Sequence, residues 1–437
     1  MVKSSHEIRD PIHGFIRLDS SERLVLDSEP FQRLRHIHQL ALSYLVYPGA
    51  THRRFEHSLG VMELAGRVFD VVTHPDNVHE KIKDLIPELR EHEVGYWRNV
   101  LRIAALCHDI GHLPFSHAAE KDLLPDGWKH ERLTKELILS DHMKPIWDKV
   151  NPPVRIEHIA KLAVGPKYFR EAPFTDWEAI LSEIIVGDAF GVDRIDYLLR
   201  DSHHAGVAYG KFDHYRLIDT LRILPREAGD SQEPALGVEE GGLHAAEALL
   251  LARYFMYTQV YFHRIRRSYD IHLKDFLVEW LPDGKFPTSL DEHLKTTDNE
   301  IMAGIRAAAR DSSLPGHDHA RRIVCREHFR VAYERNPGDI KLHPEPGRVL
   351  YAAAQEKFGK QNIRWDKYVQ EGGAPDFPVL CGDKRISSSL IMSDALTNLP
   401  VVAVDYLFIS PAKHKEAEIW LKENREATLR QFAAGED

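Results

Sequence analysis

The chain has 437 residues, 43% hydrophobic and 28% charged, which is enough apolar material for a buried core and two or three domains. Its 57 Lys and Arg against 67 Asp and Glu leave a net charge of −10, which argues against a nucleic-acid partner or a basic membrane-binding surface. No apolar run approaches the roughly 18 residues that a membrane helix needs, and three scattered cysteines imply no disulfide framework, so we expect a cytoplasmic protein with no membrane partner.

Helices dominate the expected structure of the first 280 residues. Apolar residues recur at three- and four-residue spacing over residues 55–72, 100–106, 180–199 and 245–281, which predicts helices there. Residues 227–242 are rich in Gly, Glu and Pro without periodicity, so we expect a flexible, exposed loop.

The pattern changes after about residue 282. Residues 377–381 and 401–409 are β-branched or alternating and are flanked by Gly, Pro, Asp and Ser, which predicts short strands. A final helix is expected over residues 411–432. We therefore predict a mainly α fold, with a large helical domain over residues 1–281 and a smaller α+β region over residues 282–437.

Four residues on three predicted helices have the types needed for a metal site. His57 lies in the first turn of one helix, His108 and Asp109 follow a second, apolar helix, and Asp193 lies on a third. Two imidazoles and two carboxylates form a mixed shell that suits a first-row divalent ion or Mg²⁺ and leaves positions open for water and substrate. A His-Asp dipeptide by itself is weak evidence in a chain with 27 histidines, which are more often ordinary buried or surface residues.

The third helix carries further polar residues on the same face. Asp193, Tyr197 and Asp201 are spaced four apart, so a metal ligand, a phenol and a second carboxylate point toward one pocket. Taken alone, Asp201 next to Arg200 would more often be half of a solvated ion pair.

The chain resembles the HD-domain superfamily, and within it the dGTPase-like deoxynucleoside triphosphate triphosphohydrolases related to the mammalian SAM-and-HD-domain enzyme. The segments that carry this resemblance occur in the family's order: DPIHGFIRLD, FQRLRHIHQL, YPGATHRRFEHSLGV, AALCHDIGHLPFSH, GVDRIDYLLRDSHHAG and MYTQVYFHR. No SAM domain precedes them, so we expect the bacterial branch. The resemblance implies an HD-domain helical bundle that hydrolyses dGTP and other dNTPs to deoxynucleoside and inorganic triphosphate, and that assembles as a homodimer or homotetramer.

The same resemblance implies roles for single residues. The implied metal ligands are His57, His108, Asp109 and Asp193, and the ion is divalent, with Mn, Mg, Fe, Zn, Ni and Co all open. The implied reaction-centre residues are His112, His117, His130 and Glu131. Among them we expect His117 to face the α-phosphate and His130-Glu131 to act as a supporting pair, the alternative being that His130 is a surface or outer histidine. The implied substrate contacts are Gln39 on the 3′-hydroxyl, Tyr197 and Asp201 on the sugar, and Arg54, Arg194, His263 and Arg264 on the triphosphate.

A second nucleotide site is also implied. Asp27, Gln32 and Arg35 match residues that recognise an activating guanine nucleotide, GTP or dGTP, in the mammalian enzyme; in the alternative interpretation, Gln32 and Arg35 belong to a helix that merely packs against a neighbour. This chain departs from the mammalian pattern where Gln259 replaces an Arg near the base, Arg267 replaces a Tyr over the sugar, and His6 replaces a Lys on the activator phosphates. Base preference and exclusion of a 2′-hydroxyl therefore stay open.

Two other functions compete with the triphosphohydrolase. An HD metal shell also serves nucleotide phosphomonoesterases and phosphodiesterases, and a nucleotide-sensing or nucleic-acid-binding protein could keep a regulatory HD site. The set Gln39, Tyr197 and Asp201 favours the triphosphohydrolase over the esterases. Intact ligands at all four metal positions argue against a purely regulatory site.

Overall fold

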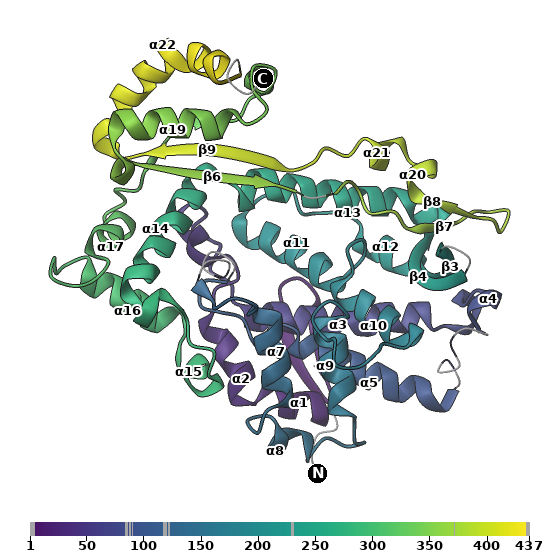
Figure 1. Cartoon of the computed structure of the whole chain (residues 1–437). Coiled ribbons are helices and arrows are strands. Elements are labelled where there is room, and N and C mark those ends of the chain that lie inside the picture. Colours follow the sequence, from purple (N-terminus) through teal and green to yellow (C-terminus); the bar gives the residue numbers. More distant parts are fainter. Residues whose placement is uncertain are drawn as a thin grey trace. The chain divides into compact units, whose positions relative to one another are not determined.

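The computed structural model describes residues 5–83, 86, 89, 91–116, 120, 123–228, 231–370 and 372–433. In these ranges the chain is mainly helical with three small sheets, which confirms the predicted fold class (Figure 1). Contacts divide it into two compact units that interleave along the sequence. The first unit comprises Met1–Met256, Phe286–Glu300 and Ala374–Leu399, and the second comprises Tyr257–Lys285, Ile301–Gly373 and Pro400–Asp437. The ranges 1–281 and 282–437 remain predictions about domains.

The first unit is a helical bundle with a hairpin near the N-terminus. Its helices are α1 (Ser20–Leu26), α2 (Glu29–Gln32), α3 (Arg54–Val72), α4 (Glu80–Lys83), α5 (Glu91–Cys107), α7 (His130–Leu139), α8 (Lys144–Trp147), α9 (Ile156–Val164), α10 (Asp176–Val186), α11 (Val192–Ala205), α12 (His214–Thr220), α13 (Leu243–Met256), α15 (Leu290–Lys295), α20 (Ser389–Met392) and α21 (Asp394–Thr397). Helices α3 and α5 run side by side, and α11 packs on α3. The expected helices over 55–72 and 100–106 are thus confirmed as α3 and part of α5.

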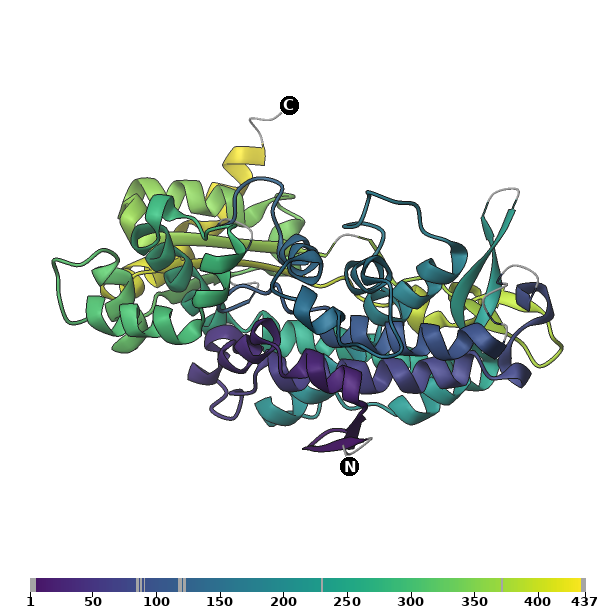
Figure 2. The ribbon, with the colours of Figure 1, turned by 90° about the horizontal axis from the view of Figure 1, so that it is seen from below.

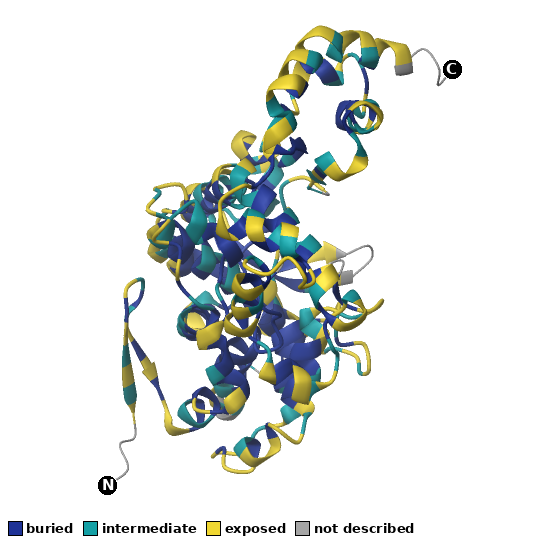
Figure 3. Cartoon of the chain, turned by 90° about the vertical axis from the view of Figure 1, so that its left-hand side faces the viewer, coloured by how far each residue is buried: buried dark blue, intermediate teal, exposed yellow. Residues whose placement is uncertain are grey.

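The hairpin pairs β1 (His6–Asp10) with β2 (Gly14–Leu18) in antiparallel register. It stands at the lower edge of Figure 2, and its strands show mostly exposed and intermediate residues in Figure 3. Its turn is different: the Asp10 carboxylate accepts the backbone N–H groups of Ile12 and His13, and Asp10 and His13 are both buried. The hairpin therefore directs polar turn residues into the bundle.

Two predicted helices are each divided in the structure. Residues 180–199 fall on α10 and α11, because Gly187 ends the first with extended backbone and Gly191 precedes the second. Residues 245–281 fall on α13 and on α14 (Arg264–Trp280), with a π-helical turn at Tyr257–Tyr261 between them. The first division makes Asp193 a first-turn residue of α11.

The expected loop over 227–242 is wrong. Residues in this segment form β3 (Leu221–Ala228) and β4 (Ser231–Glu239), an antiparallel pair extended by β7 (Pro378–Leu380) and β8 (Ile386–Ser388). Ala235, Leu236 and Val238 are buried, so β4 belongs to the core. Pro and Gly, which are depleted in strands, hid β4, although its main partner β3 directly precedes it and β7 adds a short pairing from a distant part of the sequence. The predicted strand at 377–381 is confirmed as β7.

The second unit contains a three-stranded sheet in the order β5 (Arg330–Glu334), β9 (Ala403–Ile409) and β6 (Ile363–Val369). Its helices are α14, α17 (His317–Val324), α18 (Pro337–Ile340), α19 (Pro346–Phe358) and α22 (His414–Ala433), and α16 (Asp298–Ala308) begins in the first unit's range. The predicted strand at 401–409 and the final helix are confirmed as β9 and α22. None of the described helices is long and apolar enough to cross a membrane.

Candidate metal centre

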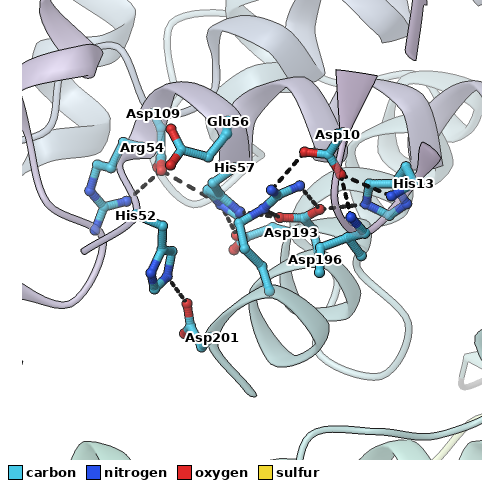
Figure 4. A network of polar contacts seen from close by, with 12 residues as sticks. Asp10, His13, His52, Arg54, Glu56, His57, Asp109, Asp193, Asp196 and Asp201 are labelled. Atoms are coloured by element: carbon cyan, nitrogen blue, oxygen red, sulfur yellow. Dashed lines mark hydrogen bonds and ion pairs between the residues drawn. The ribbon is translucent and has the colours of Figure 1, made fainter. Parts of the chain in front are cut away.

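Three helix ends bring the four predicted metal ligands together. His57 comes from the start of α3, His108 and Asp109 directly follow α5, and Asp193 lies in the first turn of α11. One ligand atom each from His57, His108 and Asp109 lies within 4.8 Å of the others. Asp193 lies beside His57 (Figure 4), with its Oδ1 3.0 Å from His57 Nε2. The same oxygen is 3.7 Å from His108 Nε2. The arrangement offers nitrogen and carboxylate donors from three elements to one ion.

The surroundings of His108 suggest that the centre fits a cation. Its Nδ1 donates to the Ala105 carbonyl at 2.7 Å, which leaves the lone pair on Nε2. This buried Nε2 has no hydrogen-bond partner among the described residues, although it lies 3.5 Å from Asp109 Oδ1. Buried polar atoms are normally satisfied, so an unpaired imidazole nitrogen beside carboxylates has the geometry of a metal ligand.

The two carboxylates stay ionised. Burial alone would raise the pKa of Asp109, but the charges of Arg54, His108 and His57 outweigh it and lower the pKa. Burial opposes ionisation of Asp193 as well, but the hydrogen bond with His57 and the nearby His108 imidazole hold its pKa well below the ordinary value. Both side chains are therefore ready to bind a cation at neutral pH.

A buried ionic network orients His57 from behind. Asp196, on α11, accepts from His57 Nδ1 at 2.8 Å and contacts His13 Nε2 at 2.6 Å. Arg200 donates to Asp196 at 2.8 and 2.9 Å and to Asp10 at 2.8 Å (Figure 4). A carboxylate on the far nitrogen fixes the ring orientation of a metal-ligating histidine, so this network aims Nε2 at the centre. The sequence interpretation missed it, although the DPIHG motif contains Asp10 and His13.

The same contacts set the protonation state of His57 in the metal-free protein. Burial lowers the pKa of the imidazole, but hydrogen bonds with Asp193 and Asp196 outweigh burial and raise the pKa to about 10. A proton thus holds Nε2 against Asp193, and a bound cation takes the place of that proton.

A close helix contact places His130 beside the centre. A Cβ on Gly111 would lie 2.1 Å from the backbone nitrogen of Thr134, so only glycine lets α7 approach the HD segment this closely. The His130 ring stacks on His112 with a centroid distance of 4.0 Å, and His112 Nε2 is 3.7 Å from Asp109 Oδ1. The structure thus brings His112 and His130 to the edge of the four-ligand cluster.

Glu120 is a second residue that the sequence interpretation missed. Its Oε1 accepts the backbone N–H of His130 at 2.9 Å and contacts His130 Nδ1 at 2.8 Å, whereas Glu131 Oε2 is 3.3 Å from that nitrogen. Burial lowers the pKa of His130, but the hydrogen bond with Glu120 and the charges of Glu120, Glu131 and Asp109 together outweigh burial and raise the pKa. His117, predicted as the catalytic histidine, lies outside the described residues.

Two of the three predicted sugar contacts, Asp201 and Gln39, lie beside His52. Asp201 Oδ1 is 2.7 Å from His52 Nε2, and the His52 ring stacks on His204. Gln39 donates its backbone N–H to the His52 carbonyl at 3.0 Å, and its buried Oε1 has no partner among the described residues. Tyr197 is half-buried on α11, one turn before Asp201. Asp201 is buried, so the solvated ion pair is not its structural state.

The predicted phosphate contacts are divided between the units. Arg54 forms an ion pair with Asp109 and donates Nε–H to Ser116 Oγ at 2.8 Å. Arg194 donates to the Gly187 carbonyl at 3.2 Å, toward the turn before α11. His263 and Arg264 precede and begin α14 in the second unit and stay predictions.

The predicted activator residues form their own small group. Gln32 Nε2 donates to the Leu26 carbonyl at 2.7 Å, next to Asp27, and Arg35 donates to Gln32 Oε1 at 2.8 Å. The Arg35 guanidinium also lies over the Phe55 ring at 3.5 Å. These contacts fit either the packing helix or a nucleotide site. Of the departures from the mammalian pattern, His6 begins β1, and Arg267 forms a two-bond ion pair with Asp366 in the second unit.

Comparisons with known proteins match this geometry. Residues 54–164 match the family model of the HD domain, and residues 212–343 match that of the HD associated region. The uncharacterized protein YwfO of Bacillus subtilis is 30% identical over 393 residues, covering 85% of this chain and 80% of that protein.

Two further relatives extend the comparison. Human deoxynucleoside triphosphate triphosphohydrolase SAMHD1 is 32% identical over 386 residues, 79% of this chain, but the match covers only 58% of the human protein. The crystal structure of a hypothetical protein from Aquifex aeolicus aligns with a TM-score of 0.76 at 30% identity, over 95% of this chain and 100% of that chain. These matches confirm the resemblance carried by the six sequence segments.

Proposed function

This chain belongs to the HD-domain family, and an HD-associated region follows its HD domain in the sequence. From this premise we propose that it is a metal-dependent dNTP triphosphohydrolase. Water attacks the α-phosphorus, the bond from that phosphorus to the 5′ oxygen breaks, and a proton passes to the 5′ oxygen. The products are deoxynucleoside and inorganic triphosphate. The observation that carries the proposal is the convergence of His57, His108 and Asp109, with a buried, unpaired Nε2 on His108.

His57, His108, Asp109 and Asp193 would hold the ion. A divalent cation bound there polarises a water molecule and offsets negative charge on the phosphate oxygens. The protein prepares this by keeping both carboxylates ionised and by fixing His57 through Asp196.

His117 and His130 are the proposed proton-transfer groups. The hydrogen bond with Glu120 favours the protonated form of His130, and a protonated imidazole is a suitable acid for an alkoxide leaving group. We assign delivery of the proton to the 5′ oxygen to His117, with His130, Glu131 and His112 supporting it.

The proposed substrate contacts separate sugar from phosphate. Asp201 and Tyr197 bind the deoxyribose, and the unpaired Oε1 of Gln39 accepts from its 3′-hydroxyl. The name of the human relative supports dNTPs as the substrate class. Cationic groups at Arg54, Arg194, His263 and Arg264 bind the triphosphate.

The proposal extends to regulation and assembly. Asp27, Gln32 and Arg35 would bind a guanine nucleotide, and the chain would act as a homodimer or homotetramer. Both follow from the family resemblance, and activity with and without GTP, together with light-scattering mass, tests them.

Product analysis in ¹⁸O-labelled water tests the reaction. The purified protein is incubated with Mn²⁺ or Mg²⁺ and each dNTP and rNTP, with and without GTP, and products are separated by mass. We expect unlabelled deoxynucleoside and inorganic triphosphate that carries one ¹⁸O. Asp109→Asn should remove turnover, whereas the exposed matched change Asp76→Asn should not. Release of monophosphate and pyrophosphate, or hydrolysis only of monophosphates or cyclic nucleotides, would refute the triphosphohydrolase and indicate an HD-type esterase.

A further inference from the structure

Asp298 joins two segments that flank the metal centre. It is the first residue of α16, is only 1% exposed, and lies within the part of the chain that matches the HD associated region. Its Oδ1 accepts the backbone N–H of Phe115 at 2.8 Å. Its Oδ2 accepts the backbone N–H of His38 at 2.8 Å and contacts His38 Nδ1 at 2.6 Å. One carboxylate therefore ties the segment after the HD motif to the segment before α3.

The Phe115–Ser116 turn needs such a tie. Both residues have positive φ, 55° and 56°, which is unfavourable for residues other than glycine and persists only where surrounding contacts hold it. Ser116 Oγ donates to the His38 carbonyl at 3.1 Å, so the two segments held by Asp298 also bond to each other. Arg33 bridges nearby, donating to the His112 and Thr296 carbonyls at 2.8 Å each.

Ser116 connects this turn to the metal ligand. Its Oγ accepts Nε–H of Arg54 at 2.8 Å, and the other end of the same guanidinium pairs with Asp109. An arginine held at two ends has a fixed plane, so its position depends on where the turn places Ser116. A shift of the turn would therefore move Arg54 relative to Asp109.

We infer that Asp298 is a positioning residue, contributed by the HD-associated region, that holds Arg54 at the metal centre through Ser116. The contacts run from Asp298 to Phe115 and His38, then to Ser116, and then to Arg54. The inference rests on the proposed function for its kinetic consequences, because Arg54 is a proposed phosphate contact. By this inference, the HD-associated region contributes a residue that positions a side chain of the metal centre.

Asp298→Asn tests the inference by replacing one acceptor oxygen with an NH₂ group, so either Phe115 or His38 loses its acceptor. We expect kcat for dNTP hydrolysis to fall about tenfold, the lower end of the effect of outer residues around metal sites, with bound metal per chain unchanged. The loss should not multiply with that of Ser116→Ala, because both changes break the same connection. Asp291→Asn, an exposed carboxylate on α15, is the matched control and should leave kcat unchanged. Fully multiplicative losses would overturn the connection through Ser116.

Hydrogen exchange gives a readout that does not need turnover. In Asp298→Asn, but not in Asp291→Asn, we expect the backbone amide that loses its acceptor, that of Phe115 or that of His38, to exchange at least about tenfold faster. If the wild-type protein has no dNTPase activity but the amide still exchanges faster in Asp298→Asn, the proposed function is refuted and the positioning role of Asp298 is supported. Unchanged exchange with unchanged kcat in an active protein would refute the positioning role. If Asp298→Asn does not fold, His38→Ala removes the ring contact with Asp298 and the ring stacking on Tyr44, and it keeps the backbone hydrogen bond to Asp298. This variant should show the same non-multiplicative loss with Ser116→Ala, and a multiplicative loss would overturn the inference.

Discussion

Two carboxylates of one helix contact the His57 imidazole. Asp193 and Asp196 lie three residues apart on α11 and contact opposite nitrogens of the imidazole. Their roles differ because their surroundings differ: Asp196 is fully buried against Arg200, whereas the Asp193 side chain is 36% exposed. Asp193 can therefore exchange its contact with His57 for an ion, while Asp196 stays paired. Residue type alone would not separate these two aspartates.

His108→Ala should remove metal binding and activity with little effect on folding. In the metal-free protein Nε2 of His108 has no described partner, so the change removes only one hydrogen bond, to Ala105, and ring packing. Metal analysis of the purified variant should show the ion lost, and circular dichroism should show an unchanged helix content. His244→Ala, at an exposed histidine, is the control and should keep metal and turnover. A metal-replete, active His108→Ala protein would contradict the assigned ligand set.

The contact between α3 and α11 depends on a residue without a side chain. A Cβ on Gly60 of α3 would lie 1.9 Å from Asp196 Oδ1 and 2.5 Å from Arg200 Nη2. The ionic network behind His57 therefore occupies the space that any larger residue would need. Helix packing and orientation of the metal ligand are thus two consequences of the same close approach.

Gly60→Ala should destabilise the protein by about 1–3 kcal/mol, the usual cost of overpacking a core, and should weaken metal binding by displacing Asp196. The matched control is Gly95→Ala on α5, where a Cβ meets nothing within 4 Å. That change should raise stability by up to about 1 kcal/mol, because Ala favours helix over Gly. Urea unfolding and metal titration of both variants measure the difference. Equal stability of the two variants would contradict the close packing at Gly60.

Both units bury histidines that favour the neutral form. Burial, with the charge of His319 and nearby arginines, lowers the pKa of His272 in the second unit to about 2. Burial and the charge of Arg33 lower the pKa of His293, in the first unit, well below its ordinary value. Such groups bind a proton when the chain unfolds but not while it is folded.

The metal-free protein should therefore lose stability as the pH falls below about 6.5, the pKa of an unfolded histidine. Between that value and the folded pKa, each such histidine lowers the free energy of unfolding by about 1.4 kcal/mol per pH unit. Urea unfolding at pH 7, 6 and 5 measures the slope. His272→Gln should reduce the slope of unfolding free energy against pH by about 1.4 kcal/mol per pH unit, the contribution of one histidine. His244→Gln, at an exposed position, should leave the slope unchanged. An unaltered slope in His272→Gln would show that His272 is protonated in the folded protein.

Apolar periodicity and local motifs predicted much of this protein. The mainly α fold, α3, α22 and the strands β7 and β9 were predictable because their signals lie within each segment. Local motifs identified His57, His108, Asp109 and Asp193 as candidate donors, and the family resemblance implied that they form one site. In the structure the four side chains lie together. The break between α10 and α11 was not predicted, because the apolar periodicity continues across it. The strand β4 was not predicted, because its segment contains Pro and Gly, which are rare in strands.

The sequence by itself determined the residue types of the centre and the helices that carry them. Only the tertiary structure decided which carboxylate lies in the four-residue cluster and which lies behind His57, that Glu120 pairs with His130, and that Asp298 reaches Phe115. The physical reason is that these choices depend on burial and on partners far away in sequence, such as His38 and Asp298, which are 260 residues apart. A charge is stable in the core only beside its partner, and sequence spacing does not contain that proximity.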